Sequence, residues 1–419
     1  MRARCLITLS LAMAVPLPAV AAEPGASYSL EQLREIARSV HPTLEVAEAA
    51  VEASSGILRQ AGAYPNPQFF VAFGRARPRD GGESGSENQI ELVQPIEMPG
   101  VRRWRSRLAE ARLRGVEVDR VLAWTLVDST VALLVYTVLL EERRADLARE
   151  SVRIAARLHE LLARRVEIGE SSPLEGARAH TELFARRRDL LEAEGATEAA
   201  RSALRLFCAD RLAGAYMIAE RLQDTVAIDL PADLIERLRS RNPLLLRAGI
   251  AVEEAEAQTG VARQERFPTI DLFAGHEVEL DREGTNLGVG LTIPLWDRKR
   301  GAISAATAEQ SAASAEVRAL SLELDTSLER ASVGYRRALA EVRLHQEGWT
   351  SNARHSLDIV TFSFENGEAS LLEVLDAQRS YLSVGLAEAE SWASLALARA
   401  EIERLIAGPL VAEEIDEQR

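Results

Sequence analysis

The chain has 419 residues and a formal net charge of −14, because 64 acidic residues outnumber 50 basic ones. Nucleic-acid binding depends on clustered cations, and no basic patch compensates for the acidity, so the composition argues against a nucleic-acid-binding protein. Of the 2 cysteines, Cys5 lies in the N-terminal segment described next, which leaves Cys208 without an intramolecular disulfide partner. Stability must therefore come from packing.

Residues 1–22 have the pattern of a secretory signal peptide, with two arginines, an apolar stretch and small residues before Glu23. The apolar stretch is shorter than the roughly 20 residues that a membrane-spanning helix needs. Cleavage after Ala22 would remove the two positive charges of Arg2 and Arg4 and change the net charge from −14 to −16. No cysteine stands at this point, so N-terminal lipidation is not expected.

The remaining sequence is a duplication. Residues 169–175 read GESSPLE and residues 367–373 read GEASLLE, 198 positions later. Further identities recur at an offset of 201: Leu33, Pro42, Leu44, Ala47, Val51, Glu52 and Ala61 match Leu234, Pro243, Leu245, Ala248, Val252, Glu253 and Ala262. A period near 200 residues is too long for a solenoid. We therefore expect two repeats, 23–222 and 223–419, that form one pseudo-symmetric body.

Each repeat is expected to contribute two strands. In the first repeat, QFFVAFGRA and NQIELVQPI predict strands over about 67–76 and 88–96, joined by a glycine- and charge-rich turn. In the second repeat, strands are expected over about 268–280 and 286–295, the last with apolar residues at every second position. Strands of about ten residues have the length of a tilted strand that crosses a membrane.

Four such strands cannot close a membrane barrel within one chain. Outer-membrane barrels need at least about 8 strands, and an open sheet edge is not tolerated in lipid. The chain is therefore expected to form an oligomer. Two copies would supply about 8 strands and three copies about 12, and this reasoning does not choose between them.

A long helix is predicted after the first pair of strands. No proline occurs between Pro99 and Pro173, and the residues between them are mostly strong helix formers. A continuous helix over 100–168 would be roughly 100 Å long. Residues 121–140 within it are almost long and apolar enough to cross a bilayer, but the central Asp128 favours a helix buried among other helices.

In each half, the long helical segment is expected to end at the repeated phrase and turn back. The tips are predicted at about 169–173 and 367–371, and helical patterns over 173–208 and 371–407 follow them. The second half also lacks proline from 295 to 408, so each repeat is predicted to form a long helical hairpin.

Both tips carry the same local signals. Gly169 and Gly367 suit helix ends in which a residue has positive φ. Each returning helix is expected to begin with a capping box of a serine and a glutamate three residues on: Ser172 with Glu175, and Ser370 with Glu373.

These features together resemble the TolC family of outer-membrane efflux channels, over essentially all of the chain after residue 22. Three segments are similar to signatures of that family: VQPIEMPGVRRWR at 93–105, IPLWDRKRGAI at 293–303 and NGEASLLEVLDAQRSYL at 366–382. The first two are most similar to the cobalt-zinc-cadmium resistance branch.

The resemblance implies a mainly α fold with a small β part. Three copies would form one twelve-stranded β-barrel in the outer membrane of a Gram-negative bacterium, and their helices would form a tapering α-barrel across the periplasm. Such a channel is a passive exit duct, and this branch favours heavy-metal cations as cargo. Its partners would be a periplasmic adaptor protein and an inner-membrane pump, of the resistance-nodulation-division type, which supplies the energy and most of the substrate choice.

The resemblance also assigns roles to the tips, which in this family close the tunnel and contact the adaptor. The corresponding residues are Gly169, Glu170, Ser171 and Ser172 in the first repeat and Gly367, Glu368, Ala369 and Ser370 in the second. An arginine that latches closed family members falls at Ala369, and its aromatic hydroxyl partner falls at Phe364. That latch is therefore missing from this chain.

Three carboxylates are the candidate gate and selectivity residues. Glu373 and Asp376 are three residues apart on a predicted helix, so they share a face, and they match an acidic pair at the family's constriction. Glu175 matches a further acidic position. Gathered in three copies, these groups would favour cations and raise some of their own pKa values. Alternatively they are solvated helix charges, and Glu175 and Glu373 serve only as caps.

No enzyme or metal centre is predicted. The 6 histidines, at positions 41, 159, 180, 276, 345 and 355, show no close ligand spacing, and only Met98 and Met217 follow residue 22. The sequence contains neither the G-x-S-x-G motif of hydrolases nor a phosphate-binding loop. We therefore expect no catalytic residue, no metal ligand and no cofactor.

Two other functions stay open. A channel of the same fold could export proteins in a type I secretion system. A structural periplasmic coiled-coil scaffold would explain the helices and the acidity, but it leaves the strands unexplained.

Overall fold

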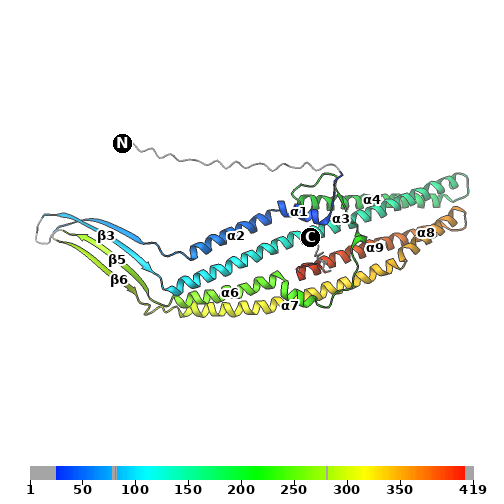
Figure 1. The fold of residues 1–419 in the computed structure, drawn as a ribbon. Coiled ribbons are helices and arrows are strands. Elements are labelled where there is room, and N and C mark those ends of the chain that lie inside the picture. Colours follow the sequence, from blue (N-terminus) through cyan, green and yellow to red (C-terminus); the bar gives the residue numbers. More distant parts are fainter. Residues whose placement is uncertain (1–24, 78–80, 82, 280–281, 411–419) are drawn as a thin grey trace, which may run out of the picture.

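The computed structural model describes residues 25–77, 81, 83–279 and 282–410. The predicted signal peptide lies outside these residues. The described part is elongated, with a small sheet at one end and long helices that run away from it (Figure 1). The predicted fold class, mainly α with a small β part, is confirmed.

The same order of elements occurs in both halves. The first half contains β1 (Ser27–Tyr28), α1 (Leu30–Val40), α2 (Pro42–Ala61), β2 (Gln68–Ala76), β3 (Gly85–Ile96), α3 (Pro99–Glu167) and α4 (Pro173–Phe207). The second half contains α5 (Leu234–Arg241), α6 (Pro243–Gln264), β5 (Thr269–Val278), β6 (Glu283–Thr292), α7 (Arg300–Gln346), α8 (Trp349–Glu365) and α9 (Leu371–Ile406). Strand β4 (Met217–Ile218), which pairs with β1, and the 3-10 helix η1 (Leu222–Asp224) lie between the halves.

The sheet joins the two halves. Its order is β2-β3-β5-β6, with every neighbouring pair antiparallel. The central pair, β3 and β5, brings Ile96 of the first half opposite Ile270 of the second. Within the described residues, the outer edges of β2 and β6 have no partner strand, as predicted for an incomplete barrel.

The two faces of the sheet differ in chemistry, because directly paired residues of an antiparallel sheet share a face. One face carries most of the large apolar side chains, and their exposure is high, with Phe73 at 82% and Leu287 at 81%. The opposite face carries four carboxylates: Glu87, Glu91, Asp271 and Glu277. An exposed apolar face opposite a polar one is the pattern of a membrane barrel, apolar toward lipid and polar toward the interior.

Three predicted strand boundaries are wrong by three residues each. Strand β3 begins at Gly85 rather than at residue 88, because it pairs with β2 as far as Ala76. Strand β6 begins at Glu283 rather than at residue 286, because it pairs with β5 as far as Val278, and it ends at Thr292 rather than at residue 295. Its partner β5 starts only after Pro268, so Thr292 opposite Thr269 is the last pair that β6 can form.

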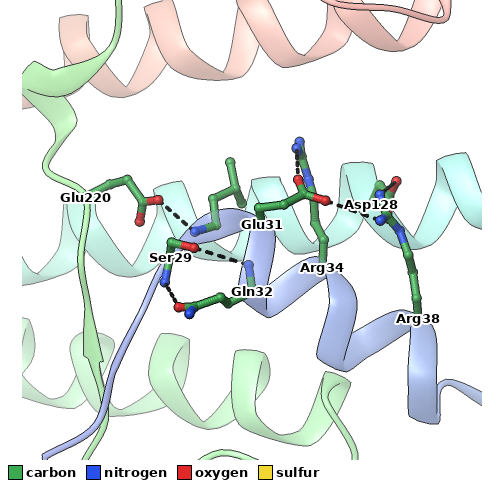
Figure 2. A network of polar contacts seen from close by, with 8 residues as sticks. Ser29, Glu31, Gln32, Arg34, Arg38, Asp128 and Glu220 are labelled. Atoms are coloured by element: carbon green, nitrogen blue, oxygen red, sulfur yellow. Dashed lines mark hydrogen bonds and ion pairs between the residues drawn. The ribbon is translucent and has the colours of Figure 1, made fainter. Parts of the chain in front are cut away.

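Helix α3 runs unbroken for 69 residues, as predicted, and is roughly 100 Å long. Its apolar segment 121–140 supplies Val131 and Val135 to the main hydrophobic core, together with residues of α1 and α9. Asp128 is held by Arg38 of α1 through two hydrogen bonds of 2.7 and 2.5 Å (Figure 2).

The burial predicted for this segment is only partial. Among the described helices, α3 alone has the length and composition of a membrane span, and 28% of its most apolar window is buried within the chain. Leu126 and Leu133 are at least half exposed. Much of the apolar surface of α3 is thus free in a single chain.

The second long helical segment is interrupted, unlike the first. Helix α7 ends at Gln346 and α8 begins at Trp349, because Gly348 adopts a φ of 112°, which cannot continue a helix. The His345 ring stacks on Trp349, with 4.7 Å between ring centroids, and its Nδ1 lies 2.9 Å from the hydroxyl of Thr350. A single long helix ending at residue 367 is therefore the wrong description of this half.

Replacing Gly348 with alanine should destabilise the protein by about 1–3 kcal/mol, because a side chain at this φ is strained. Gly334→Ala is the matched control, because Gly334 lies inside α7 with open space around its Cα. That change should stabilise by roughly 0.5–1 kcal/mol. Chemical unfolding of the two variants should give opposite signs, and a Gly348→Ala protein as stable as the parent would contradict the assigned break.

Candidate functional site

The two hairpin tips have the same backbone turn. Gly169 and Gly367 both have a φ of 80°. In each tip the glycine and the glutamate after it donate to carbonyls of the preceding helix: Gly169 to Val166, Glu170 to Arg165, Gly367 to Phe364 and Glu368 to Ser363. This is the Schellman arrangement that ends a helix at a glycine. The positive φ predicted for both glycines is confirmed.

The predicted capping boxes are both present. The N–H and hydroxyl of Ser370 donate to the Glu373 carboxylate at 2.6 and 2.9 Å, and the Glu373 N–H donates back to the serine oxygen at 3.3 Å. Ser172 and Glu175 form the same box at the start of α4. The repeated phrase therefore encodes a complete turn and helix start, which fixes where each hairpin reverses.

The candidate gate carboxylates differ in their surroundings. Asp376 and Glu373 are exposed on one face of α9, and Asp376 has no ion-pair partner among the described residues. Glu175 is half-buried. Because Glu175 and Glu373 both cap helices, Asp376 is the one candidate of the three that the capping boxes do not use.

A groove of about 670 Å³ separates the starts of α4 and α9 at the tips. It is lined by Glu175, Arg178, Glu182, Leu372, Leu375 and Arg379, among others. Two of the sequence-predicted residues, Glu175 and Ser370, thus share one surface with two arginines. Arg178 and Arg379 escaped the sequence reasoning, although Arg379 lies three residues after Asp376 and hence on the same helix face.

A small hydrophobic cluster holds the four helices together below the tips. Its buried members are Leu158 and Leu162 of α3, Ala179 of α4, Phe364 of α8, and Leu371, Val374 and Leu375 of α9. The position that the family resemblance reserves for an aromatic hydroxyl is therefore a core position here, with Phe364 only 4% exposed.

Arg165 ties the first hairpin to the second. Its guanidinium donates to the carbonyl oxygens of Phe364 and Glu365 at 3.2 and 2.7 Å, and it lies 5.4 Å from the centre of the Phe364 ring. These carbonyls belong to the last turn of α8. The Phe364 carbonyl also accepts from the Gly367 N–H, whereas no backbone N–H among the described residues donates to the Glu365 carbonyl. A cation at a helix C-terminus is also favoured by the helix dipole.

The clasp formed by Arg165 occurs once, although the tips are duplicated. The corresponding position of the second repeat, 198 residues later, is Ser363, which is too short for the same contact. A second link follows from Glu150 of α3, which accepts hydrogen bonds from Tyr381 of α9 at 2.9 Å and from Arg354 of α8. Sequence reasoning missed Arg165, and its mismatch with Ser363 is the signal that marks it.

The hydrogen bonds of the capping box change the pKa of Glu373. The pKa of Glu373 lies below its ordinary value of 4.5, because the backbone N–H and then the hydroxyl of Ser370 stabilise the carboxylate. Sister carboxylates are not part of the single chain, so the upward shift expected for a ring of three copies stays a prediction. Within the described residues, no group of three or more His, Cys, Asp or Glu could hold a metal ion.

The model of the outer membrane efflux protein family matches the chain twice, over residues 33–209 and 234–408. The chain belongs to this family. It is 26% identical over 373 residues to the cobalt-zinc-cadmium resistance protein CzcC of Cupriavidus metallidurans, covering 87% of this chain and 86% of that one. It is 27% identical to the nickel-cobalt-cadmium resistance protein NccC of Alcaligenes xylosoxydans, covering 78% and 73% of the two chains.

The fold of this efflux protein is that of known outer-membrane channels. The crystal structure of CusC superposes with a TM-score of 0.79, at 18% identity, over 96% of this chain and 99% of that one. The predicted family, its metal-resistance branch and the outer-membrane location are thereby confirmed.

Acidification should loosen the start of α9. A carboxylate with a lowered pKa contributes stability above its ordinary value and loses it as the pH falls, so the Ser370–Glu373 cap should weaken below 4.5. Hydrogen exchange of the first-turn amides of α9, corrected for intrinsic rates, should show this loss of protection. Ser370→Ala should lower the protection already at neutral pH and flatten its pH dependence. Equal pH profiles for both proteins would contradict the cap's role.

Proposed function

We propose that this efflux protein is the exit duct of a tripartite complex and that it passively conducts heavy-metal cations to the cell exterior. Three copies would close its sheet edges into a twelve-stranded barrel. The proposal rests on the four-stranded sheet, which has one exposed apolar face suited to contact lipid and, within the described residues, two edges without a partner strand. The cargo is proposed from the names of the two metal-resistance relatives.

The opposite sheet face supports a cation path. Once the apolar face is turned toward lipid, Glu87, Glu91, Asp271 and Glu277 face the interior of the barrel. Three copies would place twelve carboxylates along it. Rings of carboxylates favour cations over anions in a pore.

At the other end of the duct, we assign Glu373 and Asp376 to the periplasmic constriction. Asp376 contributes most to this ring because its carboxylate is free, whereas Glu373 also caps α9. Glu175 is a weaker member, since it caps α4 and shares its groove with Arg178.

The tips are the proposed contact with a periplasmic adaptor, which would link the duct to an inner-membrane pump of the resistance-nodulation-division type. Glu170 and Glu368 are exposed at the turns. The groove between α4 and α9 offers leucines beside charges of both signs, a surface that suits a helical partner.

Arg165 is the proposed latch that replaces the missing family arginine at position 369. Widening a tunnel built of helical hairpins requires neighbouring hairpins to move apart. The bond from Arg165 to the end of α8 must then break. Because it joins two hairpins of the same chain, it restrains the tip without any contact between copies.

Deleting the gene should sensitise the bacterium to zinc, cobalt or cadmium, and re-expressing the chain should restore resistance. The decisive comparison is metal content of whole cells with and without the protein. If metal resistance is unchanged but a protein disappears from the culture medium, the duct belongs to a type I secretion system instead. A chain that washes off outer-membrane fractions without detergent would be a scaffold.

Neutralising the constriction should weaken cation selectivity. In planar bilayers, Glu373→Gln with Asp376→Asn should shift the reversal potential toward zero in a salt gradient and reduce block by divalent cations. Glu316→Gln with Glu323→Gln is the control of equal charge, because both residues are exposed on α7, away from the tips. Equal selectivity in the two double variants would remove Glu373 and Asp376 from the gate.

Removing the clasp should open the tip. Arg165→Ala leaves the Glu365 carbonyl without its donor and the Phe364 carbonyl with only the Gly367 N–H. Losing these bonds should cost about 1–3 kcal/mol, so open-channel events in bilayers should become more frequent. Arg165→Lys should give a frequency of open-channel events between those of the parent and Arg165→Ala. An ammonium group cannot bind both carbonyls and also stack on the Phe364 ring. The neighbouring Arg164→Ala is the control, because Arg164 is exposed and its side chain pairs with Glu160 of its own helix rather than with the second hairpin. If Arg164→Ala and Arg165→Ala channels open equally often, Arg165 does not act as a latch.

A further inference from the structure

Two of the signature-like segments, 93–105 and 293–303, lie where the sheet gives way to the helices. Strand β3 ends at Ile96 and α3 begins at Pro99, while β6 ends at Thr292 and α7 begins at Arg300. Figure 1 shows both helices starting at the same end of the sheet. The exit duct described above does not explain why these segments are so basic.

Contacts between four helix ends join these segments into one level of the molecule. Arg105 of α3 donates to the carbonyls of Ala61 and Ala63 at the end of α2, at 2.8 and 3.0 Å. Gly100 lies so close to Gln264 of α6 that a Cβ there would clash with its side chain. Helix α6 in turn contacts α7 through Thr259, whose hydroxyl donates to Ala306 at 3.1 Å. We call residues 62–67, 97–107, 263–268 and 293–300 the collar.

The collar is strongly basic in an acidic chain. It contains nine basic residues and three acidic ones: Arg102, Arg103, Arg105, Arg107, Arg263, Arg266, Arg298, Lys299 and Arg300, against Glu97, Glu265 and Asp297. Its net charge is therefore +6, compared with −14 for the whole sequence. The sequence interpretation that no basic patch compensates for the acidity is wrong here. The charges come from separate segments that only the fold brings together.

Most of these cations are not neutralised by the protein. Within the described ranges, only Arg105 and Lys299 of the nine have a carboxylate oxygen within 4.0 Å. Arg266, Arg298 and Arg300 are exposed. Unpaired like charges held at one level repel each other unless an anion lies between them.

Exposed aromatic side chains lie among the cations. Trp296 is 94% exposed, Tyr64 71% and Phe267 43%. The Arg102 guanidinium lies 4.2 Å above the centre of the Tyr64 ring, and Arg266 lies 5.0 Å from that of Phe267. Aromatic rings beside cations, next to the end of a lipid-facing sheet, are typical of the membrane–water interface.

The apolar side of β6 leads directly into this level. Leu291, Ile293 and Leu295 continue the every-second-residue pattern of the lipid-facing side, and each is more than half exposed. Trp296 and Arg298 follow them. The chain thus passes from lipid-facing leucines to an indole and then to cations within a few residues, which is the order of layers in a bilayer from its core to its headgroups.

We propose that the collar binds the anionic headgroups of phospholipids in the periplasmic leaflet of the outer membrane. Guanidinium groups form paired hydrogen bonds with phosphate oxygens, and each cation near an anionic surface adds to the attraction. The collar thus fixes the depth of the barrel in the membrane. The indole N–H of Trp296 and the hydroxyl of Tyr64 would then lie at the level of the headgroups.

The test uses the purified full chain in vesicles of phosphatidylethanolamine with a minor fraction of brominated lipid, which quenches tryptophan fluorescence at close range. Brominated phosphatidylglycerol should quench Trp296 more than brominated phosphatidylethanolamine, with a preference of about fivefold. Trp296→Phe should remove most of the difference. Arg298→Gln with Lys299→Gln and Arg300→Gln should reduce the preference toward one, whereas Arg298→Lys with Arg300→Lys should keep it.

Arg153→Gln with Arg318→Gln and Arg330→Gln removes the same charge from exposed helix positions outside the collar and should keep the preference. Equal quenching by the two lipids in the parent protein, or equal loss in both triple variants, overturns the proposal. The collar variant could instead keep its lipid preference but lose binding to purified cell-wall sacculi, while the control variant keeps that binding. This outcome would assign the collar to the cell wall. If the collar variant does not fold, the parent protein alone can be tested with added salt, which should weaken its preference for phosphatidylglycerol. A preference that salt does not weaken would overturn the proposal.

Discussion

Unpaired backbone groups at the edges of the sheet constrain everything else in this protein. In lipid, each N–H and C=O group without a partner costs several kcal/mol. Strands β2 and β6 each expose one such edge. A single chain with these edges in lipid would therefore be unstable, and the proposed closure by sister copies would cover both edges at once. The long helices start at the end of this sheet, so the proposed closure would also set their spacing around one axis.

The duplication explains the architecture, and its departures from symmetry explain the candidate mechanism. Both tips use a positive-φ glycine and a serine–glutamate capping box. Only the first carries Arg165, and only the second long helix is broken, at Gly348. The matching position of α3 is Glu150, which sits inside a continuous helix and bonds to α8 and α9. The first hairpin thus has one continuous long helix before its tip, whereas the second has a divided one.

The chain separates its charges along its length. Carboxylates line one sheet face and the start of α9, whereas uncompensated arginines gather at the collar. A protein with the proposed cation path and the proposed contact with anionic lipids would need charges of both signs, at different levels. The net charge of −14 is a sum over the whole sequence, so it does not show that positive and negative charges are separated along the molecule.

The sequence by itself determined the four strands of the main sheet, the helical hairpins and the two tips, although it missed the break at Gly348. Helix caps, glycine turns and period-two strands are local signals: Ser370, Glu373 and Gly367 specify their turn whatever surrounds them. Family membership followed from such local signatures and from the repeat. Only the tertiary structure decided the Arg165 clasp, the end of β6 and the basic collar. These depend on residues far apart in the chain, such as Arg165 with Glu365 and Arg105 with Ala61, whose meeting is set by packing and strand register.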